Sequence, residues 1–311
     1  MSGVEIEQVT LTDGPMRVSL LSLGATTQGW WVNEVPLILG YEDPGAYTQN
    51  SGYLGVIAGR VANRIGGATF ELDGVRYVLD ANEGQNTLHG GAQSMVRQNW
   101  QIEQRSQTEA ILHLFSNDGD CGFPGQVRFT LQVTLQAPRL IYTFLAEVDR
   151  PTPISLAQHN YYTLGETDGI AGLSLRLPGD HLLEKDAEGV PTGEILPATG
   201  PYDFRDFRPL HTAPDLDHFY PFRPSVAGAL RDIAELRAAS GLGLRVMSDQ
   251  PGAQVYAGGG LGAPFAPGAG VCIEPSGFPN AVNVGHFPSM IVTPDHPYCQ
   301  RLVLDLTGAG I

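Results

Sequence analysis

The sequence contains a single lysine, Lys185, among 311 residues, and its 18 basic side chains are outnumbered by 33 acidic ones, which gives a formal charge of −15. Proteins that bind nucleic acid or an anionic membrane surface need clustered Lys and Arg to contact phosphates, and this chain has no basic run. A Schiff-base mechanism would have to use Lys185, but its acidic neighbours Glu184, Asp186 and Glu188 favour the protonated amine. We therefore expect no nucleic-acid partner, no membrane partner and no lysine nucleophile.

Cysteine is also scarce, and the histidines are scattered. The cysteines Cys121, Cys272 and Cys299 lie far apart and include no C-x-x-C pair, so the sequence predicts neither a disulfide framework nor a zinc ribbon. None of the eight histidines forms an H-x-x-x-H or H-x-H pair, and we predict no metal site. The three glycines at 258–260 lack the strand–glycine–helix pattern of a phosphate-binding loop. We therefore expect no cofactor.

Long apolar runs are absent as well. No window reaches the roughly 18–20 apolar residues of a membrane-spanning helix, and residues 1–11 lack the basic region and apolar stretch of a secretory signal. The sequence thus predicts a soluble cytoplasmic protein. Its 42% of hydrophobic residues supply ample material for a packed core, which excludes global disorder.

Alternation of apolar and polar residues dominates what the sequence does contain. Residues 127–136 alternate throughout, as in a half-buried strand, and 140–148 follow Pro138 as a second strand, so the two predict a hairpin. Residues 173–177 alternate similarly, whereas both faces of 111–116 are mostly apolar, which predicts a strand buried on both sides. Turn signals recur at Asp73-Gly74, Asn117-Asp118-Gly119 and Ser240-Gly241. Many short strands with Gly and Pro turns predict an all-β sandwich or barrel.

One segment, residues 226–239, conflicts with this pattern. It is rich in helix formers, and its apolar residues Ala229, Leu230, Ile233 and Leu236 fall near helical spacing. Local rules therefore favour a helix there, and no other segment of the chain predicts one.

Three stretches combine ionisable residues with bends and aromatic side chains. They are Gly59-Arg60-Val61-Ala62-Asn63-Arg64-Ile65 followed by Leu88-His89-Gly90-Gly91, Gln158-His159-Asn160-Tyr161-Tyr162, and Ile273 with Glu274 through Asn283. A histidine held by aromatic residues and a glutamate beside a proline can each be tuned toward neutral pH by burial, and together they would form an acid–base pair. Taken singly, His89 and His159 are typical of structural histidines, Glu274 of a solvated carboxylate and Arg64 of a surface ion-pair partner. The types and spacing of these residues alone therefore do not indicate a function.

The order of the motifs along the chain carries more information than any one of them. In sequence they are G-R-V-A-N-R-I at 59–65, F-E-L-D-G at 70–74, N-T-L-H-G-G at 86–91, G-F-P-G at 122–125, L-A-Q-H-N-Y-Y-T-L at 156–164, P-T-G-E at 191–194, D-F-R at 203–205, Asp217-His218, P-G-A-Q-V-Y at 251–256 and E-P-S-G-F-P-N-A-V-N at 274–283. Together, over about residues 55–298, they resemble the aldose 1-epimerase (galactose mutarotase) family. The resemblance implies a single antiparallel β-sandwich over residues 1–311, and a hairpin about Ser240-Gly241 in place of the helix.

The resemblance also implies the chemistry. A pyranose interconverts its anomers through the free aldehyde, so the C1 hydroxyl must lose a proton while the ring oxygen gains one. Glu274 matches the family's base and would take the C1–OH proton, and His159 matches its acid and would protonate the ring oxygen. Rotation about C1–C2 then presents the other face, and the two groups reverse roles on closure.

Further residues match the family's substrate site. His89 and Arg64 would hydrogen-bond near the ring oxygen and stabilise charge that develops there. Sugar hydroxyls would be oriented by Asn63, Asp217 and Gln254. Tyr161 or Phe278 could pack on the C–H face of the sugar, and the sequence does not choose between them.

The chain departs from the family's pattern at three places. Residues 294–297 read P-D-H-P where the family has Pro-Gly-Glu, which puts a loop geometry in doubt. The segment before His218 contains both Asp215 and Asp217, so Asp215 is a rival for the hydroxyl contact. Ser276 or Gly277 stands where the family has Gln, which bears on the pocket near C1 and on the preferred sugar.

Two alternatives to a cofactor-free mutarotase of a free monosaccharide stay open. An epimerase of a phosphorylated hexose on the same fold would need an Arg or Lys cluster for the phosphate, for which Arg97 and Arg128 are available. A sugar-binding module without catalysis would bind with zero turnover, and the presence of both His159 and Glu274 argues against it. The sequence is equally compatible with a monomer and a homodimer.

Overall fold

In the computed structural model, which describes residues 5–213, 215–223, 226 and 228–308, the alternating segment 127–136 forms strand β12 (Val127–Gln136). It pairs antiparallel with β13 (Arg139–Val148), which confirms the predicted hairpin. The apolar members of the alternation, such as Phe129 and Leu131, are buried, whereas Arg128 on the opposite face is exposed. The alternation therefore gives the hairpin one core face and one outer face.

This hairpin belongs to a nine-stranded antiparallel sheet with the order β10-β11-β12-β13-β27-β23-β22-β17-β20. The other strands are β10 (Gln101–Gln104), β11 (Glu109–Ser116), β27 (Tyr298–Thr307), β23 (Gly243–Ser248), β22 (Arg231–Ala238), β17 (Leu173–Arg176) and β20 (Arg208–Pro209). The last strand of the chain, β27, lies between β13 and β23 and so joins the two halves of the sheet.

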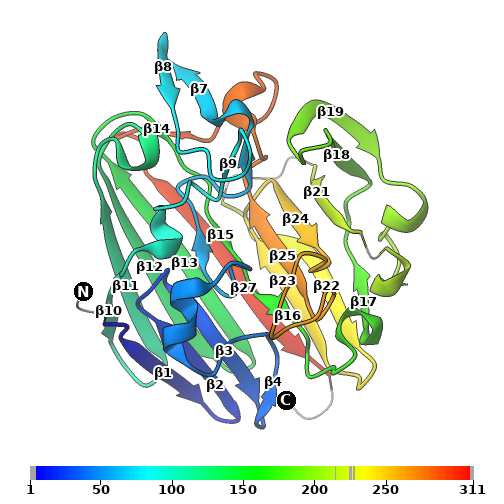
Figure 1. The fold of residues 1–311 in the computed structure, drawn as a ribbon. Coiled ribbons are helices and arrows are strands. Elements are labelled where there is room, and N and C mark those ends of the chain that lie inside the picture. Colours follow the sequence, from blue (N-terminus) through cyan, green and yellow to red (C-terminus); the bar gives the residue numbers. More distant parts are fainter. Residues whose placement is uncertain (1–4, 214, 224–225, 227, 309–311) are drawn as a thin grey trace.

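Two four-stranded sheets complete the main architecture. The first contains β1 (Gln8–Asp13), β2 (Met16–Leu21), β3 (Thr26–Val32) and β4 (Val35–Pro36). The second has the order β16 (Tyr161–Tyr162), β25 (Val271–Ser276), β24 (Gly252–Tyr256) and β21 (Asp217–Pro221). In Figure 1 the second sheet lies in front of the nine-stranded sheet.

Two-stranded sheets and short 3₁₀ helices fill the connections. The pairs are β14 (Thr152–Pro153) with β26 (Ile291–Val292), β15 (Ala157–Gln158) with β5 (Ile57–Ala58), β18 (His181–Lys185) with β19 (Pro191–Pro197), β6 (Arg64–Ile65) with β9 (Thr87–Leu88), and β7 (Thr69–Leu72) with β8 (Val75–Val78). The 3₁₀ helices are η1 (Pro44–Gln49), η2 (Gly66–Ala68), η3 (Met95–Arg97), η4 (Asp120–Gly122), η5 (Gly169–Gly172), η6 (Gly200–Tyr202), η7 (Leu210–Thr212) and η8 (Ala281–Asn283). Within the described ranges there is no α-helix, and no helix there is long and apolar enough to cross a membrane.

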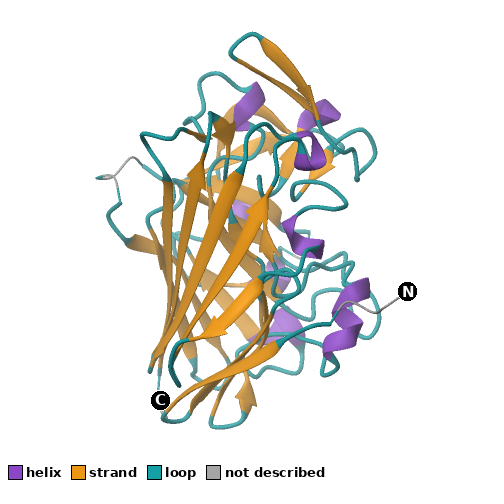
Figure 2. Ribbon diagram, turned by 90° about the vertical axis from the view of Figure 1, so that its left-hand side faces the viewer, coloured by secondary structure: helices purple, strands orange, loops and turns teal. Residues whose placement is uncertain are grey.

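The core lies between the sheets. One buried cluster joins Phe129 and Tyr142 of the nine-stranded sheet with Trp30 of the first four-stranded sheet and Val255 and Ile273 of the second. Figure 2 shows the long strands as one twisted layer at the left and the short helices with their loops gathered to the right of it. The molecule is therefore a β-sandwich whose large sheet supports the smaller ones.

Strand β11 corrects one expectation. The sequence predicts a strand buried on both sides, but His113 and Phe115 face outward, and Phe115 is 44% exposed. The outer face of the sheet is open to solvent at this strand. The guanidinium of Arg128 lies 5.3 Å from the centroid of the Phe115 ring and covers part of it.

Residues 226–239 contain no helix where the structure describes them, and residue 227 lies outside the described residues. Strands β22 and β23 form a hairpin about Ser240-Gly241, as the resemblance implies, so the helix favoured by local rules is wrong. Ile233 and Leu236 are buried in the core, with a bulge between Asp232 and Ala234. Pairing with β17 and β23 outweighs the weak helix propensity of the segment.

Candidate active site

All seven residues singled out for the site line one pocket of about 200 Å³, although they span the chain from Asn63 to Glu274. They are Asn63, Arg64, His89, His159, Asp217, Gln254 and Glu274. The pocket lies where the sheet β16-β25-β24-β21 meets the segments around 51–53, 63–64 and 83–89. The structure therefore brings together every predicted site residue.

The strand alternation of the second four-stranded sheet places three of these side chains. In β25 Val271 and Ile273 belong to the main core, so Glu274 takes the opposite, pocket-facing side. Gln254 is the cross-strand partner of Glu274 in β24, so their side chains lie side by side. Asp217 begins β21 and accepts a 2.6 Å hydrogen bond from Nε2 of Gln254 through Oδ1.

His159 lies in the turn between β15 and β16, and both of its backbone groups are bonded to a neighbouring loop. Its N–H donates to the carbonyl of Val56 at 3.0 Å, and its carbonyl accepts from Gly55 N–H at 2.9 Å. The side chain is buried, with Nε2 3.8 Å from Oε2 of Glu274 and Nδ1 3.4 Å from Sγ of Cys272. The imidazole thus faces the carboxyl group through Nε2 and a thiol through Nδ1.

Burial shifts the pKa values of Glu274 and His159 in opposite directions. Desolvation raises the pKa of Glu274 to about 8, the nearby Asp217 adds to the rise, and Arg64 opposes it. Desolvation lowers the pKa of His159 to about 4, against smaller raising effects that include the charge of Asp217. The two groups together therefore hold one proton across most of the neutral range.

His89 is held as a neutral hydrogen-bond donor. Its Nδ1 accepts the N–H of Asn63 at 3.2 Å, so its ring proton belongs on Nε2. Burial lowers the pKa of His89 well below its usual value, and His159 and Arg64 lower it further. Asn63 and His89 both adopt positive φ, at 61° and 49°. The two residues are also joined through the backbone, because His89 N–H donates to the Asn63 carbonyl at 3.0 Å. The following Gly90 and Gly91 also have positive φ, at 85° and 105°.

The guanidinium of Arg64 forms an ion pair with Glu83 at the pocket wall. Its Nε and Nη2 donate to the two carboxylate oxygens of Glu83 at 2.5 and 2.8 Å, which fixes the guanidinium by a bidentate contact. Burial would lower the pKa of Arg64, but the hydrogen bond and the charge of Glu83 outweigh burial, so the pKa lies above its ordinary value. Arg64 is therefore a fixed positive charge at the pocket wall.

The structure separates the two aspartates between which the sequence does not choose. Asp217 lines the pocket, and Nζ of Lys185 lies 3.5 Å from its Oδ2 while donating to its backbone carbonyl. Asp215 instead accepts a hydrogen bond of 2.9 Å from the hydroxyl of Tyr202 at the surface. Of the two aspartates, Asp217 is thus the one that faces the pocket.

The structure also distinguishes between the two aromatic candidates, Tyr161 and Phe278. Tyr161 lines the pocket, with its ring centroid 5.2 Å from that of His159, whereas Phe278 packs against Phe219 and Phe287 away from it. Tyr161 is the candidate for the C–H face of a sugar.

Sequence reasoning missed several residues of the pocket. Glu83 and Tyr256 lie within or beside the quoted motifs, and Tyr256 is two residues after Gln254, so strand alternation could have found it. Tyr53 contacts His89 edge-on at a centroid distance of 4.7 Å, and nothing in its local sequence signals this. The wall is completed by Ser51, Gly52, Leu88 and Gly260.

One buried group has the composition of a metal site. His159, Cys272 and Glu274 each offer a ligand atom, and these atoms lie within 4.8 Å of one another. Cys272 does not line the pocket, however, and its Sγ is in contact with Nδ1 of His159. The sulfur is therefore placed as a partner of the imidazole and not as a ligand open to the pocket.

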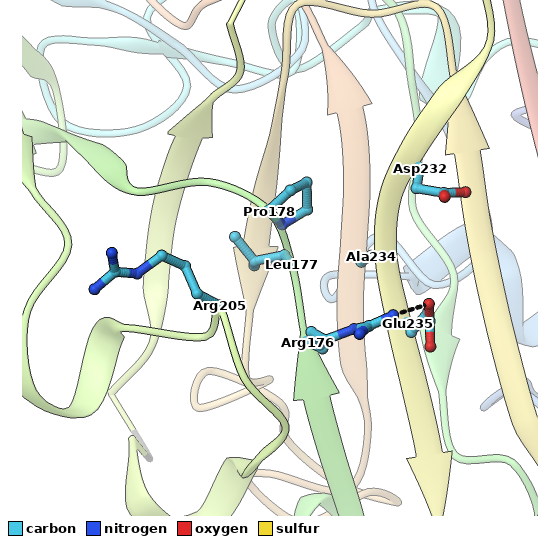
Figure 3. A pocket seen from close by; sticks show the side chains of 7 residues that line it. All are labelled: Arg176, Leu177, Pro178, Arg205, Asp232, Ala234 and Glu235. Carbon is cyan, nitrogen blue, oxygen red and sulfur yellow. Dashed lines mark hydrogen bonds and ion pairs between the residues drawn. The ribbon is translucent and has the colours of Figure 1, made fainter.

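Two other pockets, as far as their described lining residues show, hold ionisable groups without a buried pair of this kind. The pocket in Figure 3, of about 240 Å³, has Glu235 paired with Arg176 and Asp232 paired with Arg245. A larger pocket of about 620 Å³ near β18 contains His181, which is bonded to Asp180. In the larger pocket, Asp180 also pairs with Arg223, whereas Arg231 and His286 bond to backbone carbonyls.

Comparison with known proteins agrees with this geometry. A family model described as aldose 1-epimerase matches residues 7–305. The chain is 31% identical to the galactose mutarotase of Sus scrofa, over 94% of this chain and 92% of that one, and 29% identical to the aldose 1-epimerase of Escherichia coli, over 88% and 86%. A crystal structure of a GalM/aldose epimerase homologue from C. elegans superimposes with a TM-score of 0.93 at 25% identity and covers 98% of this chain and all of that one.

Proposed function

From the premise that this chain belongs to the aldose 1-epimerase family, we propose that it interconverts the α and β anomers of a free aldose, with Glu274 as the base and His159 as the acid. The observation that carries the residue assignment is the buried pair itself. A carboxyl group and an imidazole lie 3.8 Å apart in a sugar-sized pocket, and each is only 4% exposed.

The reaction moves one proton in each direction and needs no other reagent. Glu274 takes the C1–OH proton as the C1–O5 bond breaks and C1 becomes the aldehyde carbon, while Nε2 of His159 gives its proton to O5. The pair then stands as a carboxylic acid and a neutral imidazole. After rotation about C1–C2, O5 attacks the other face of C1, its proton returns to His159, and Glu274 returns a proton to the new hydroxyl.

The energies of the two proton arrangements suit this cycle. The difference between pKa values of about 8 and about 4 favours the proton on Glu274 by about 5 kcal/mol. The opposite charges of the carboxylate and the imidazolium, 3.8 Å apart, attract by about 4 kcal/mol at an effective dielectric constant of about 20. The attraction therefore offsets much of the preference for the proton on Glu274, so both proton arrangements are accessible to the pair.

Neighbouring groups supply polarity at the ring oxygen and at the hydroxyls. Nε2–H of His89 and the guanidinium of Arg64 donate toward the charge that develops at O5. Asn63, Gln254 and Asp217 bind sugar hydroxyls, with the last two already linked to each other. Because His89 cannot readily take a second proton, it stabilises the ring oxygen without competing as an acid.

The charges around the pocket favour a free sugar over a phosphorylated one. Arg64 is the one Lys or Arg among the residues that line the pocket, and its guanidinium is committed to Glu83. Arg97 donates to the backbone carbonyls of Thr48 and Asn50, and Arg128 lies on the outer face of β12. A dianionic phosphate would thus find no cluster of free cations among these residues.

Polarimetry tests the proposal. Freshly dissolved α-D-galactose, α-D-glucose and L-arabinose relax slowly to anomeric equilibrium, and we expect the enzyme to accelerate at least one of them. Binding of glucose compared with that of glucose 6-phosphate examines the phosphorylated alternative, which tighter binding of the phosphate would favour. Measurable affinity without acceleration for any sugar would indicate a binding module.

Two variants and two matched controls test the residue roles. Glu274→Gln and His159→Asn should each lower kcat by at least about a hundredfold, because each removes one proton-transfer group. Glu147→Gln and His113→Asn make the same chemical changes on the exposed outer face of the nine-stranded sheet and should leave the rate unchanged. Equal rates in the site variants and the controls would contradict the assignment.

A further inference from the structure

A buried thiol that the reaction does not use, that of Cys272, lies next to the acid–base pair. Sγ of Cys272 is 3.4 Å from Nδ1 of His159, whereas Oε2 of Glu274 lies 3.8 Å from Nε2 of the same ring. Cys272 is fully buried and does not line the pocket, so no substrate touches it. Among the described residues, its sulfur is the side-chain atom in hydrogen-bond contact with the imidazole Nδ1, and the backbone of His159 itself also hydrogen-bonds to the ring.

The proposed reaction sets a requirement on that nitrogen. His159 gives and takes its proton at Nε2, which faces Glu274. When Nε2 has lost the proton, the neutral ring must carry its remaining proton on Nδ1, and in the imidazolium Nδ1 is also protonated. Nδ1 therefore needs an acceptor at every stage, since a buried N–H without a partner is costly.

The neighbouring histidine shows the opposite arrangement. Nδ1 of His89 accepts a backbone N–H from Asn63, which forces the ring proton onto Nε2. His89 and His159 have centroids 5.3 Å apart in the same pocket, yet their Nδ1 atoms meet a donor in one case and a sulfur in the other. The partner of Nδ1 thus distinguishes a fixed donor from a group that can exchange a proton.

We propose that Cys272 is a positioning residue whose sulfur accepts the Nδ1–H of His159, so that Nε2 is the nitrogen that exchanges the proton. This inference rests on the proposed function of His159 as the acid. A carboxylate at this place would strengthen the imidazolium and hold the proton on His159. A sulfur is a weak, uncharged acceptor, so it fixes the tautomer while leaving the two proton arrangements close in energy.

The surroundings keep the sulfur in this state. Burial raises the pKa of the Cys272 thiol well above its usual value, and the charge of Glu274 raises it further, so it remains uncharged. A hydrogen bond with Tyr161 opposes this rise in the pKa of Cys272, and the Tyr161 hydroxyl also donates to the carbonyl of Gly52 at 2.9 Å. The titratable groups that face His159 are Cys272, Glu274, His89, Tyr53, Tyr161 and Asp217.

Nitrogen-15 spectra of histidine-labelled enzyme test the tautomer directly, with His159→Asn used to assign the signal. At pH 6 the wild type should show the Nδ1–H tautomer at His159 and the Nε2–H tautomer at His89. An Nε2–H tautomer at His159 would overturn the inference. This readout needs no substrate, so it fails or succeeds separately from the proposed mutarotase activity.

Substitutions at Cys272 add a kinetic test. Cys272→Ala removes the acceptor, and we expect kcat to fall about tenfold with KM changed less than twofold and the Nδ1–H tautomer of His159 depleted. Cys272→Ser supplies a hydroxyl acceptor and should retain kcat within about threefold, although it packs less well than the thiol. Cys299→Ala at an exposed cysteine is the control. Equal kcat in the Ala and Ser variants would overturn the inference.

Discussion

The titration of the buried pair gives the sharpest quantitative expectation. Glu274 and His159 must share one proton for the reaction, because a second proton blocks the base and loss of the only proton removes the acid. Burial holds the pKa of His159 at about 4 and that of Glu274 at about 8. We therefore predict a bell-shaped dependence of kcat/KM on pH, with limbs near pH 4 and near pH 8 and a broad plateau between them.

The sign of each limb follows from the charges. Below about pH 4 His159 gains a proton while Glu274 already carries one, so no base is left. Above about pH 8 Glu274 loses the shared proton, so no acid is left. Within the plateau the attraction between the carboxylate and the imidazolium offsets much of the preference for the proton on Glu274.

The assay is the polarimetric relaxation of a free aldose at each pH, after subtraction of the uncatalysed rate in the same buffer. A single limb near pH 6.5 would mean that an ordinary, solvated histidine controls the rate and would refute the reasoning from burial. A profile that is flat from pH 3 to pH 9 would equally refute the shared proton.

Three further outcomes are expected. Asp217→Asn removes a charge that raises the pKa of Glu274, so the alkaline limb of kcat/KM should move to lower pH; an unmoved limb would contradict this. Glu83→Ala removes the bidentate partner of the largely buried Arg64 and should raise KM severalfold and lower the free energy of unfolding, measured by initial rates and urea unfolding; an unchanged KM would contradict this. Arg60→Ala leaves buried carbonyl groups of Pro124, Gly125 and Asn117 without their donor and should lower the free energy of unfolding by about 3 kcal/mol or more in urea titrations; a loss below 1 kcal/mol would count against it.

Much of the fold could be predicted from the alternation of apolar and polar residues, because the large sheet has one buried face and one face open to solvent. The segment 127–136 carries that pattern in its own residues, and the structure confirms it as β12. The same pattern misled at 111–116, since an apolar Phe115 does not reveal that its face is uncovered. At 226–239 the local propensity pointed to a helix, and pairing with two neighbouring strands decided otherwise.

The site was accessible only through the order of several motifs. Nothing in the residues near His159 or Glu274 says that they meet, because contact between β25 and the turn before β16 is a property of the sheet. Glu83 and Tyr53 reach the pocket through tertiary contacts with Arg64 and His89, which local sequence does not encode. Protonation states depend on burial and therefore required the folded chain.

The central claim is that Glu274 and His159 act as one proton-transfer unit, and a double-mutant comparison of kcat in α-D-galactose or the best aldose tests it most directly. If they act as a unit, Glu274→Gln combined with His159→Asn should be about as slow as either single variant, because removal of one group already disables the exchange. Losses that multiply in the double variant would show two independent contributions, and wild-type rates in either single variant would contradict the account altogether.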